Sequence, residues 1–114
     1  MFDDITSVAL GSALDGLALR QRTIANNVAN MDTPNFHAGR VDFESALKSA
    51  LDTGSSPAVT STVSQSLDPT GTNGNNVNLD TETLTNVQTG LSYQLALRAT
   101  DDQFSLLRSA LRSQ

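Results

Sequence analysis

The strongest constraint on the fold is a stripe of apolar side chains within the first 31 residues. Its members recur at alternating steps of three and four, and only Gln21 interrupts the series. That spacing places them on one face of a single α-helix. Pro34 disfavours the helical conformation at Thr33, so the helix is expected to end near residues 32–34. This stripe, the N-terminal seam, comprises Leu10, Leu14, Leu17, Ile24 and Val28, followed by Met31.

A second apolar series occupies residues 79–114. Asp80 is expected to cap a long helix there, and Gly90 weakens that helix by about 1 kcal/mol relative to alanine. The C-terminal seam comprises Leu84, Val87, Leu91, Leu97, Phe104, Leu107 and Leu111, with Leu95 just before an offset in the spacing. Each helix has one stripe to bury, so the economical arrangement packs the seams against each other. We expect a mainly α protein whose long N- and C-terminal helices form an antiparallel-type helical pair or coiled coil.

The segment between these helices is poor in apolar residues. Asp42 is expected to cap a short helix that buries Phe43, and Gly54 is expected to end it. Of the 27 residues from 52 to 78, 19 are Ser, Thr, Asn, Gly or Pro, and only a weak strand around Val63 is indicated. We divide the chain into an N-terminal helix (1–34), a middle with a loop, a short helix and a largely irregular polar stretch (35–78), and a C-terminal helix (79–114), together forming one assembly domain.

The composition indicates a small hydrophobic core, which makes burial of apolar surface by a partner plausible on physical grounds. Hydrophobic residues make up 38% of the chain and aromatics 4%, whereas a globular domain is roughly 45–50% apolar. So few large side chains build only a thin core. The seams are therefore interpreted about equally as ordinary core and as partner surface.

Charge and motifs exclude several classes of function. The net charge of −5 disfavours binding to a nucleic-acid backbone of the same sign. The chain has no cysteine and one histidine, His37, and it contains no hydrolase, metalloprotease or phosphate-loop motif. We expect no enzyme activity, no cofactor and no metal site. No apolar run reaches the roughly 20 residues of a membrane span, and the N-terminus does not resemble a secretory signal.

The end of the first helix is rich in asparagine. Asn27 and Asn30 lie three residues apart and share a face. Their amides are expected to bond local backbone or an adjacent loop, where the end of a helix leaves backbone groups open. A helix cap is the simplest interpretation. Farther along, Asn73-Gly74 is typical of a tight turn.

Residues 25–34, ANNVANMDTP, resemble the N-terminal signature of the bacterial flagellar rod and hook axial proteins. That signature commonly reads A-N-N-x-A-N-x-x-T-P-G-Y. Asn35 stands where the family usually has glycine, so the turn there is expected to keep a positive φ. Phe36 replaces the usual tyrosine. Three later stretches also resemble rod proteins of this family in order and spacing, namely residues 40–44, 74–82 and 91–94.

The resemblance implies a structural subunit of the flagellar basal-body (proximal) rod, needed for flagellum assembly and motility. The implied partners are copies of itself and other rod proteins, with a FliE-like adaptor, the membrane ring and the export gate at the rod base. The subunit would pass through the flagellar type III export apparatus without a cleavable signal and join the part of the rod that crosses the periplasm. A small helical adaptor or secretion chaperone is the alternative, because it would use the same seams to hold a client.

The resemblance also implies which residues serve assembly. Besides the two seams, these are the signature residues and the element that follows them: Asn27, Asn30, Asp32, Thr33, Pro34, Phe36, Asp42 and Phe43.

Overall fold

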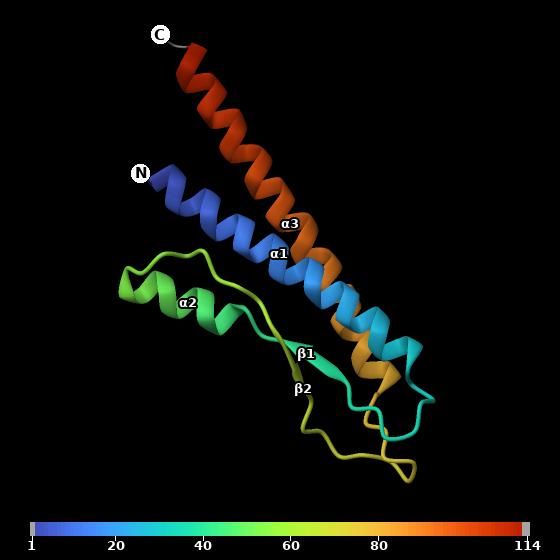
Figure 1. Ribbon diagram of the computed structural model, residues 1–114. Coiled ribbons are helices and arrows are strands. Elements are labelled where there is room, and N and C mark those ends of the chain that lie inside the picture. Colours follow the sequence, from blue (N-terminus) through green and yellow to red (C-terminus); the bar gives the residue numbers. More distant parts are fainter. Residues whose placement is uncertain (1, 113–114) are drawn as a thin grey trace.

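Two long helices lie side by side and set the shape of the molecule (Figure 1). The computed structural model describes residues 2–112, with side chains from residue 5 onward. Helix α1 spans Phe2–Ala29 and helix α3 spans Leu79–Arg112. The helices run in opposite directions, and near their far ends the Ser7 hydroxyl donates to Gln103 Oε1 at 3.2 Å. The predicted mainly α fold with a pair of long helices is confirmed.

The molecule is elongated and exposes much of its surface. Its principal extents are 66 × 27 × 14 Å and its radius of gyration is 17.6 Å, against about 13 Å for a compact chain of this length. Its accessible surface is 7786 Å², whereas a compact monomer of this mass exposes about 6,000 Å². The buried apolar residues of the described chain are Leu17, Ile24, Ala38, Val41 and Phe43.

Helix α1 is the central element, because α3 covers one side of it and the middle of the chain covers another (Figure 1). The middle contains strand β1 (Gly39–Val41), helix α2 (Glu44–Thr53) and strand β2 (Val63–Gln65). The two strands pair antiparallel, with Val41 opposite Val63. The strand indicated around Val63 is confirmed, whereas its partner β1 lies in the segment before the short helix, where only a loop was expected.

The ends of α2 follow most of the predicted chemistry. Gly54 adopts φ 74° and donates its N–H to the carbonyl of Leu51, which confirms it as the end of the helix. The cap position at the start is Phe43, so the prediction that Asp42 occupies it is wrong by one residue. The Asp42 carboxylate nevertheless accepts hydrogen bonds from the backbone N–H and the hydroxyl of Ser45, at 3.2 and 3.0 Å.

Helix α3 is capped by Asn78 rather than by Asp80. The Asn78 Oδ1 accepts hydrogen bonds from the backbone N–H groups of Asp80 and Thr81, at 3.0 and 3.3 Å. Asparagine is as good an N-cap as aspartate, and Asn78 sits two residues earlier. The helix therefore begins at Leu79, inside the range expected for it.

A small core forms where α1, β1 and the start of α2 meet. Leu17, Val41 and Phe43 are buried together, and Tyr93 and Ala96 of α3 close it from the other side. The Phe43 ring lies directly against the backbone of Gly16, in space that a Cβ atom would occupy. Glycine is thus required at that position for the ring to reach α1.

The N-terminal seam packs only in part as predicted. Leu17 and Ile24 are buried, and Leu10 and Leu14 are half-buried. Val28 is exposed, so its predicted inward position is wrong.

The C-terminal seam is the main departure from expectation, because α3 turns a polar face toward α1. Its less exposed residues recur at helical spacing and are small or polar: Glu82, Thr85, Thr89, Tyr93, Ala96, Thr100 and Gln103. Every predicted seam residue of α3 is exposed, so the prediction that the two apolar seams pack together is wrong: Leu84, Val87, Leu91, Leu97, Phe104, Leu107 and Leu111. The inward face of α3 carries Glu82, whose carboxylate accepts hydrogen bonds from Asn27 of α1 and Arg40 of β1, so the leucines on the opposite side of α3 face outward.

Candidate functional site

The predicted signature lies at the corner where α1 ends, and Asn27 is its centre. Asn27 has no exposed surface. Its Oδ1 accepts from the N–H of Gly39 at 2.8 Å, and its Nδ2 donates to the carbonyl of Gly39 at 3.0 Å. A side-chain amide thus pairs with the backbone of β1 as a neighbouring strand would. The same Nδ2 donates to Glu82 Oε1 at 2.7 Å, which joins the corner to α3.

Two further asparagines hold the loop before α3 against this corner. The Asn76 Oδ1 accepts from the N–H of Ala38 at 2.7 Å, and its Nδ2 donates to the carbonyls of Ser66 and Asp68. The Asn75 Nδ2 donates to the carbonyls of Asn30 and Thr33, at 2.9 and 2.8 Å. Both asparagines are buried. Side-chain amides therefore satisfy the backbone groups that the end of α1 and the following turns leave open.

The turn after α1 has the conformation that the sequence indicated. Asn35 has φ 62°, as expected for a residue that replaces glycine, and its N–H donates to the carbonyl of Asn73 at 2.9 Å. Asn30 donates from Nδ2 to the carbonyl of Asn26 at 2.8 Å, and its Oδ1 accepts from the Thr33 hydroxyl at 3.2 Å. The expected hydrogen bonds of Asn27 and Asn30 to local backbone and an adjacent loop are confirmed.

Glu82 is the charged residue buried at this corner, with 1% of its surface exposed. Its Oε1 accepts from Asn27, and its Oε2 accepts from Arg40 Nη1 at 3.0 Å. The other arginine nitrogen, Nη2, is buried without a hydrogen bond and lies 3.7 Å from the carboxylate of Asp68. One carboxylate thus ties together α1, β1 and α3.

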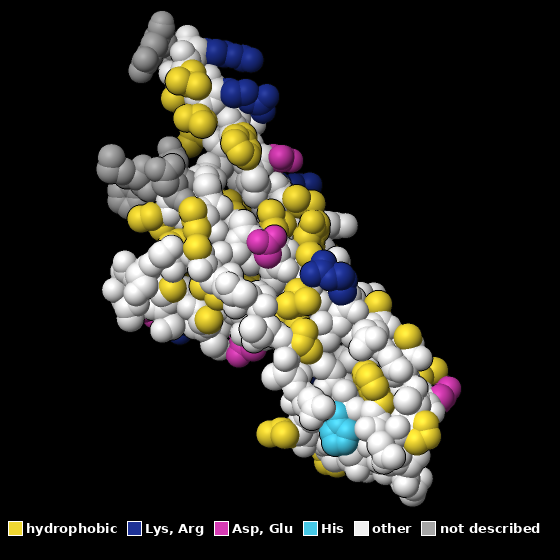
Figure 2. All heavy atoms as spheres, in the orientation of Figure 1, with side chains coloured by type: hydrophobic (Ala, Val, Ile, Leu, Met, Phe, Trp, Pro, Cys, Tyr) yellow, Lys and Arg dark blue, Asp and Glu magenta, His cyan; other side chains and the backbone are white. Residues whose placement is uncertain are grey.

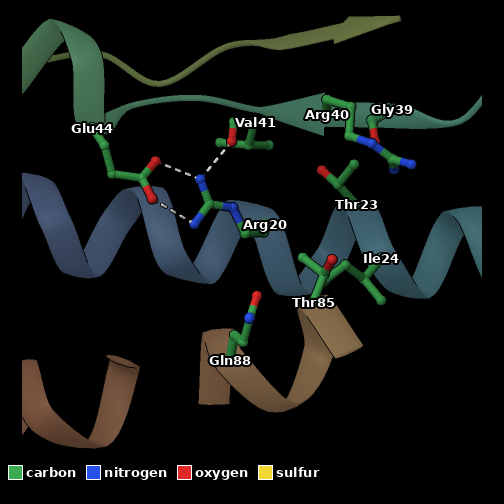
Figure 3. A pocket seen from close by; sticks show the side chains of 9 residues that line it. All are labelled: Arg20, Thr23, Ile24, Gly39, Arg40, Val41, Glu44, Thr85 and Gln88. Atoms are coloured by element: carbon green, nitrogen blue, oxygen red, sulfur yellow. Dashed lines mark hydrogen bonds and ion pairs between the residues drawn. The ribbon is translucent and has the colours of Figure 1, made fainter. Parts of the chain in front are cut away.

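A second arginine attaches the middle of the chain to α1. Arg20 donates two hydrogen bonds to Glu44, at 2.9 and 2.5 Å, and one to the carbonyl of Val41 at 2.5 Å (Figure 3). Its guanidinium also lies over the Phe43 ring, 5.1 Å from the centroid. The hydrogen bond from Arg20 lowers the pKa of the Glu44 carboxyl below its usual value, although partial burial opposes this shift.

The two arginines border a hollow between α1, β1 and α3 (Figure 3). It has a volume of about 280 Å³, with Ile24 at its apolar side and Thr85 and Gln88 reaching in from α3. In the close view, the Arg20 guanidinium points toward Glu44, and the Arg40 guanidinium lies at the far end of the group. Both guanidinium groups are engaged with carboxylates of this chain, so the hollow presents paired charges to a ligand.

Apolar side chains are exposed at several places on the surface of the long helices (Figure 2). Leu84, Val87, Leu91 and Leu95 form one exposed stripe, here called the outer stripe, with 55–70% of each residue exposed. A shallow groove crosses it between Leu91, Leu95 and Arg98. Toward the C-terminus the apolar residues shift around the helix to Leu97, Phe104, Leu107 and Leu111, here called the distal cluster.

The remaining predicted site residues are distributed unevenly. Asn27 and Phe43 are buried and Phe36 is half-buried, whereas Asp32, Thr33, Pro34 and Asp42 are exposed. The sequence did not indicate roles for Arg20, Arg40 and Glu82, which carry the ion pairs of the site. Glu82 closes the stretch 74–82, which resembles the rod proteins, so that resemblance could have pointed to a role for this residue.

Within residues 2–112, the helices lack a stretch that is both long enough and apolar enough to cross a membrane.

Comparison with known proteins gives consistent matches. The family model for flagella basal body rod proteins matches residues 9–37. The flagellar basal body rod protein FlgB of Bacillus subtilis is 30% identical, over 90% of this chain and 89% of the relative. FlgB of Escherichia coli is 31% identical, over 89% of this chain and 88% of the relative. FlgB of Borrelia hermsii is 55% identical over a shorter stretch, 33% of this chain and 28% of the relative.

Proposed function

This chain belongs to the FlgB family of flagellar basal body rod proteins, and on that premise we propose that the exposed apolar surface of α3 is where it joins its neighbours. The protein is a structural subunit of the basal body rod, needed for flagellum assembly and motility, and it assembles with other rod components. The observation that carries the proposal is the exposure of the outer stripe and the distal cluster.

The amount of exposed surface supports assembly. The chain exposes 7786 Å², which is about 1,800 Å² more than a compact monomer of its mass would expose. A standard interface covers about 800 Å² of each partner. The excess therefore corresponds to about two such interfaces. Exposed apolar patches of this kind mark interaction sites in soluble proteins.

The positions of the two surfaces also favour two different neighbours. The outer stripe faces away from α1, whereas the distal cluster lies on another side of α3 and extends from Leu97 to Leu111, close to the end of the helix. A subunit that contacts neighbours through unlike surfaces builds an open array rather than a closed pair. Copies of the chain and other rod proteins are the proposed occupants, with a FliE-like adaptor, the membrane ring and the export gate as neighbours at the rod base.

The signature corner has a supporting role in this proposal. Asn27 and Phe43 hold the corner together from inside, and the exposed residues Asp32, Thr33 and Pro34 are free to meet a neighbour. The chain acts as one assembly domain made of residues 1–34, 35–78 and 79–114. Helix α1 contacts α3, β1 and α2, which joins the three parts. The subunit is proposed to reach the periplasm-crossing rod through the type III export apparatus without a cleavable signal.

A purely structural, non-enzymatic role fits the site. The charged groups of the hollow are tied to one another and hold the fold together. A small helical adaptor or secretion chaperone would use the same exposed leucines, but such a protein has no need of the asparagine corner. Deletion distinguishes the two: loss of the rod with export intact supports the structural subunit, and loss of one exported client supports the chaperone.

A substitution in the distal cluster tests the assembly surface. Leu107→Asp is expected to abolish motility and incorporation into basal bodies while leaving export intact, because an exported chain travels unfolded. Ser105→Asp is the matched control, since it adds the same charge to an exposed position on nearly the opposite side of α3. Normal swimming of the Leu107→Asp strain would contradict the proposal. Loss of export would assign the helix to recognition by the secretion apparatus instead.

A further inference from the structure

Apolar packing accounts for only part of how α3 sits on α1, because it is limited to Tyr93 and Ala96. The face of α3 that meets α1 carries Thr85, Thr89 and Thr100, with Tyr93 and Ala96 as its apolar members. The leucines Leu84, Leu91 and Leu95 lie on the opposite side of the helix, and Leu107 and Leu111 lie beyond the contact at Gln103 and are exposed. The three threonines look much alike from one turn to the next, so they do not by themselves distinguish the observed register from its neighbours. Another feature must select the observed register.

Glu82 is the feature that distinguishes one register from the rest. Both of its carboxylate oxygens are occupied, Oε1 by Asn27 at 2.7 Å and Oε2 by Arg40 at 3.0 Å. These donors come from α1 and β1, so the contact fixes α3 both along and around its axis. Asn27 is itself held by two hydrogen bonds to Gly39, which do not involve α3.

Displaced registers cannot satisfy the same donors. A shift of α3 by one turn in one direction would bring Thr85 or Asn86 opposite Asn27 and Arg40, and in the other direction Asn78 or Leu79. None of these residues supplies a carboxylate, so Arg40 would lose its hydrogen-bonded partner and keep only Asp68, whose carboxylate lies 3.7 Å from Nη2. Removing one partner of a buried pair carries a large penalty, whereas replacing both with apolar residues is often neutral. Buried polar groups of this kind are known to specify register in helical assemblies.

We propose that Glu82 is the positioning residue that sets the register and rotation of α3 against α1, and so aims the outer stripe away from the helix pair. The register does not depend on the proposed function. Its consequence for the rod does rest on that function, because the direction in which the leucines point decides where a neighbour can bind.

The natural absence of cysteine makes the register directly measurable. In the purified full-length chain, Ser7→Cys with Gln103→Cys places two thiols at positions in contact in the observed register, since the native side chains are 3.2 Å apart. Ser7→Cys with Thr100→Cys or with Leu107→Cys reports a shift of about one turn in either direction. A short thiol-specific cross-linker and mass spectrometry quantify each pair. The first pair is expected to dominate, and equal yields for all three would overturn the proposal.

The decisive variant is Arg40→Met with Glu82→Leu, which replaces the buried ion pair with apolar residues of similar size. Its midpoint of urea unfolding is expected to stay the same or rise. Its ratio of native to shifted cross-links is expected to fall by about tenfold, which is the change that one unsatisfied buried group produces in an equilibrium constant. A merely stabilising role for Glu82 would not alter that ratio. An unchanged ratio in a folded double variant would overturn the proposal.

Two single variants separate the effect of the Glu82 charge from a general loss of stability. Glu82→Gln retains the side-chain volume but removes the charge, and it is expected to lower the same ratio by a smaller factor. Thr89→Val changes another buried residue of the same face without touching the network, and it should leave the ratio as in the parent. A fall in Thr89→Val equal to that in Glu82→Gln would contradict the assignment. The cross-linking measurements use the purified chain and test only the register of α3. Swimming of the Leu107→Asp strain tests the assembly surface, so failure of one proposal is distinguishable from failure of the other.

Discussion

Helices α1 and α3 are built from similar apolar patterns and use them in opposite ways. α1 turns Leu17 and Ile24 inward, whereas α3 turns Leu84 and Leu91 outward. The difference follows from what covers each helix. α1 has α3 on one side and the β1–α2 segment on another, while α3 meets α1 along one face only. The helical spacing of apolar residues therefore predicts that they share a face, but the neighbouring elements decide whether that face is buried.

The two helices also differ in the polar contacts that hold them in place. Helix α3 is held by Glu82 to Asn27 and Arg40, so its polar face must point inward. Helix α1 is held to the middle of the chain by apolar packing of Phe43 on Gly16 and by Arg20. The internal stability of the subunit thus rests mostly on α1, and the surface left for assembly rests mostly on α3.

Truncating one leucine on each helix gives the sharpest test of this contrast. Leu17→Ala is expected to lower the free energy of unfolding by about 2–5 kcal/mol, because it opens a cavity in the small core. Leu91→Ala, with 63% of the native residue exposed, should change it by less than about 0.5 kcal/mol. Urea denaturation followed by circular dichroism measures both. Equal losses would show that the two helices do not differ in burial.

Adding a single methyl group to α1 tests its close contact with the middle segment. Gly16→Ala is expected to destabilise the fold by about 1–3 kcal/mol, because the new Cβ would occupy the place of the Phe43 ring. Gly11→Ala in the same helix meets nothing within 4 Å and should stabilise it by about 0.5–1 kcal/mol. The same holds for Gly90→Ala in α3. Thermal unfolding of the three variants should separate Gly16 from the other two.

The corner between the helices should respond in a graded way. Asn30→Leu is expected to cost about 1–2 kcal/mol, because it removes the hydrogen bond to the carbonyl of Asn26 and leaves Thr33 without its partner. Thr33→Ala removes only a hydroxyl and should cost no more than about 1 kcal/mol. Unfolding midpoints and swimming assays measure both. An Asn30→Leu strain with parental stability and swimming would show that this corner is dispensable.

The smallest effect is expected at the Arg20–Glu44 ion pair, and it depends on pH. The pKa of Glu44 in the folded chain lies below its ordinary value of 4.5. Its contribution is therefore fully present above pH 4.5 and is lost as the pH falls through the lower folded pKa. Glu44→Gln should cost up to about 1 kcal/mol at neutral pH, as for other exposed pairs.

This difference between Glu44→Gln and the parent should shrink when unfolding is measured at progressively lower pH below 4.5. Asp52→Asn removes a charge from the same helix without an arginine partner in the described contacts, and it serves as the control. A difference that grows on acidification would contradict the assigned sign.

Local patterns were sufficient to predict several elements correctly. The two long helices, the end of α2 at Gly54 and the positive φ at Asn35 each depend on neighbouring residues in the chain. Helical spacing, glycine at a helix end and asparagine in a left-handed turn act over a few residues. The family signature was equally accessible, because residues 25–34 form one continuous stretch.

Such patterns could not predict which face of each helix is buried. A stripe of leucines shows that a helix has an apolar side, but it does not show what lies opposite that side. In this protein the answer depends on Glu82, which meets a residue 55 positions away in the chain, and on Arg40, 42 positions away. The pairing of β1 with β2 and the bonds of Asn75 and Asn76 are likewise between distant segments. Burial is a property of the assembled neighbours, and only the folded chain brings those neighbours together.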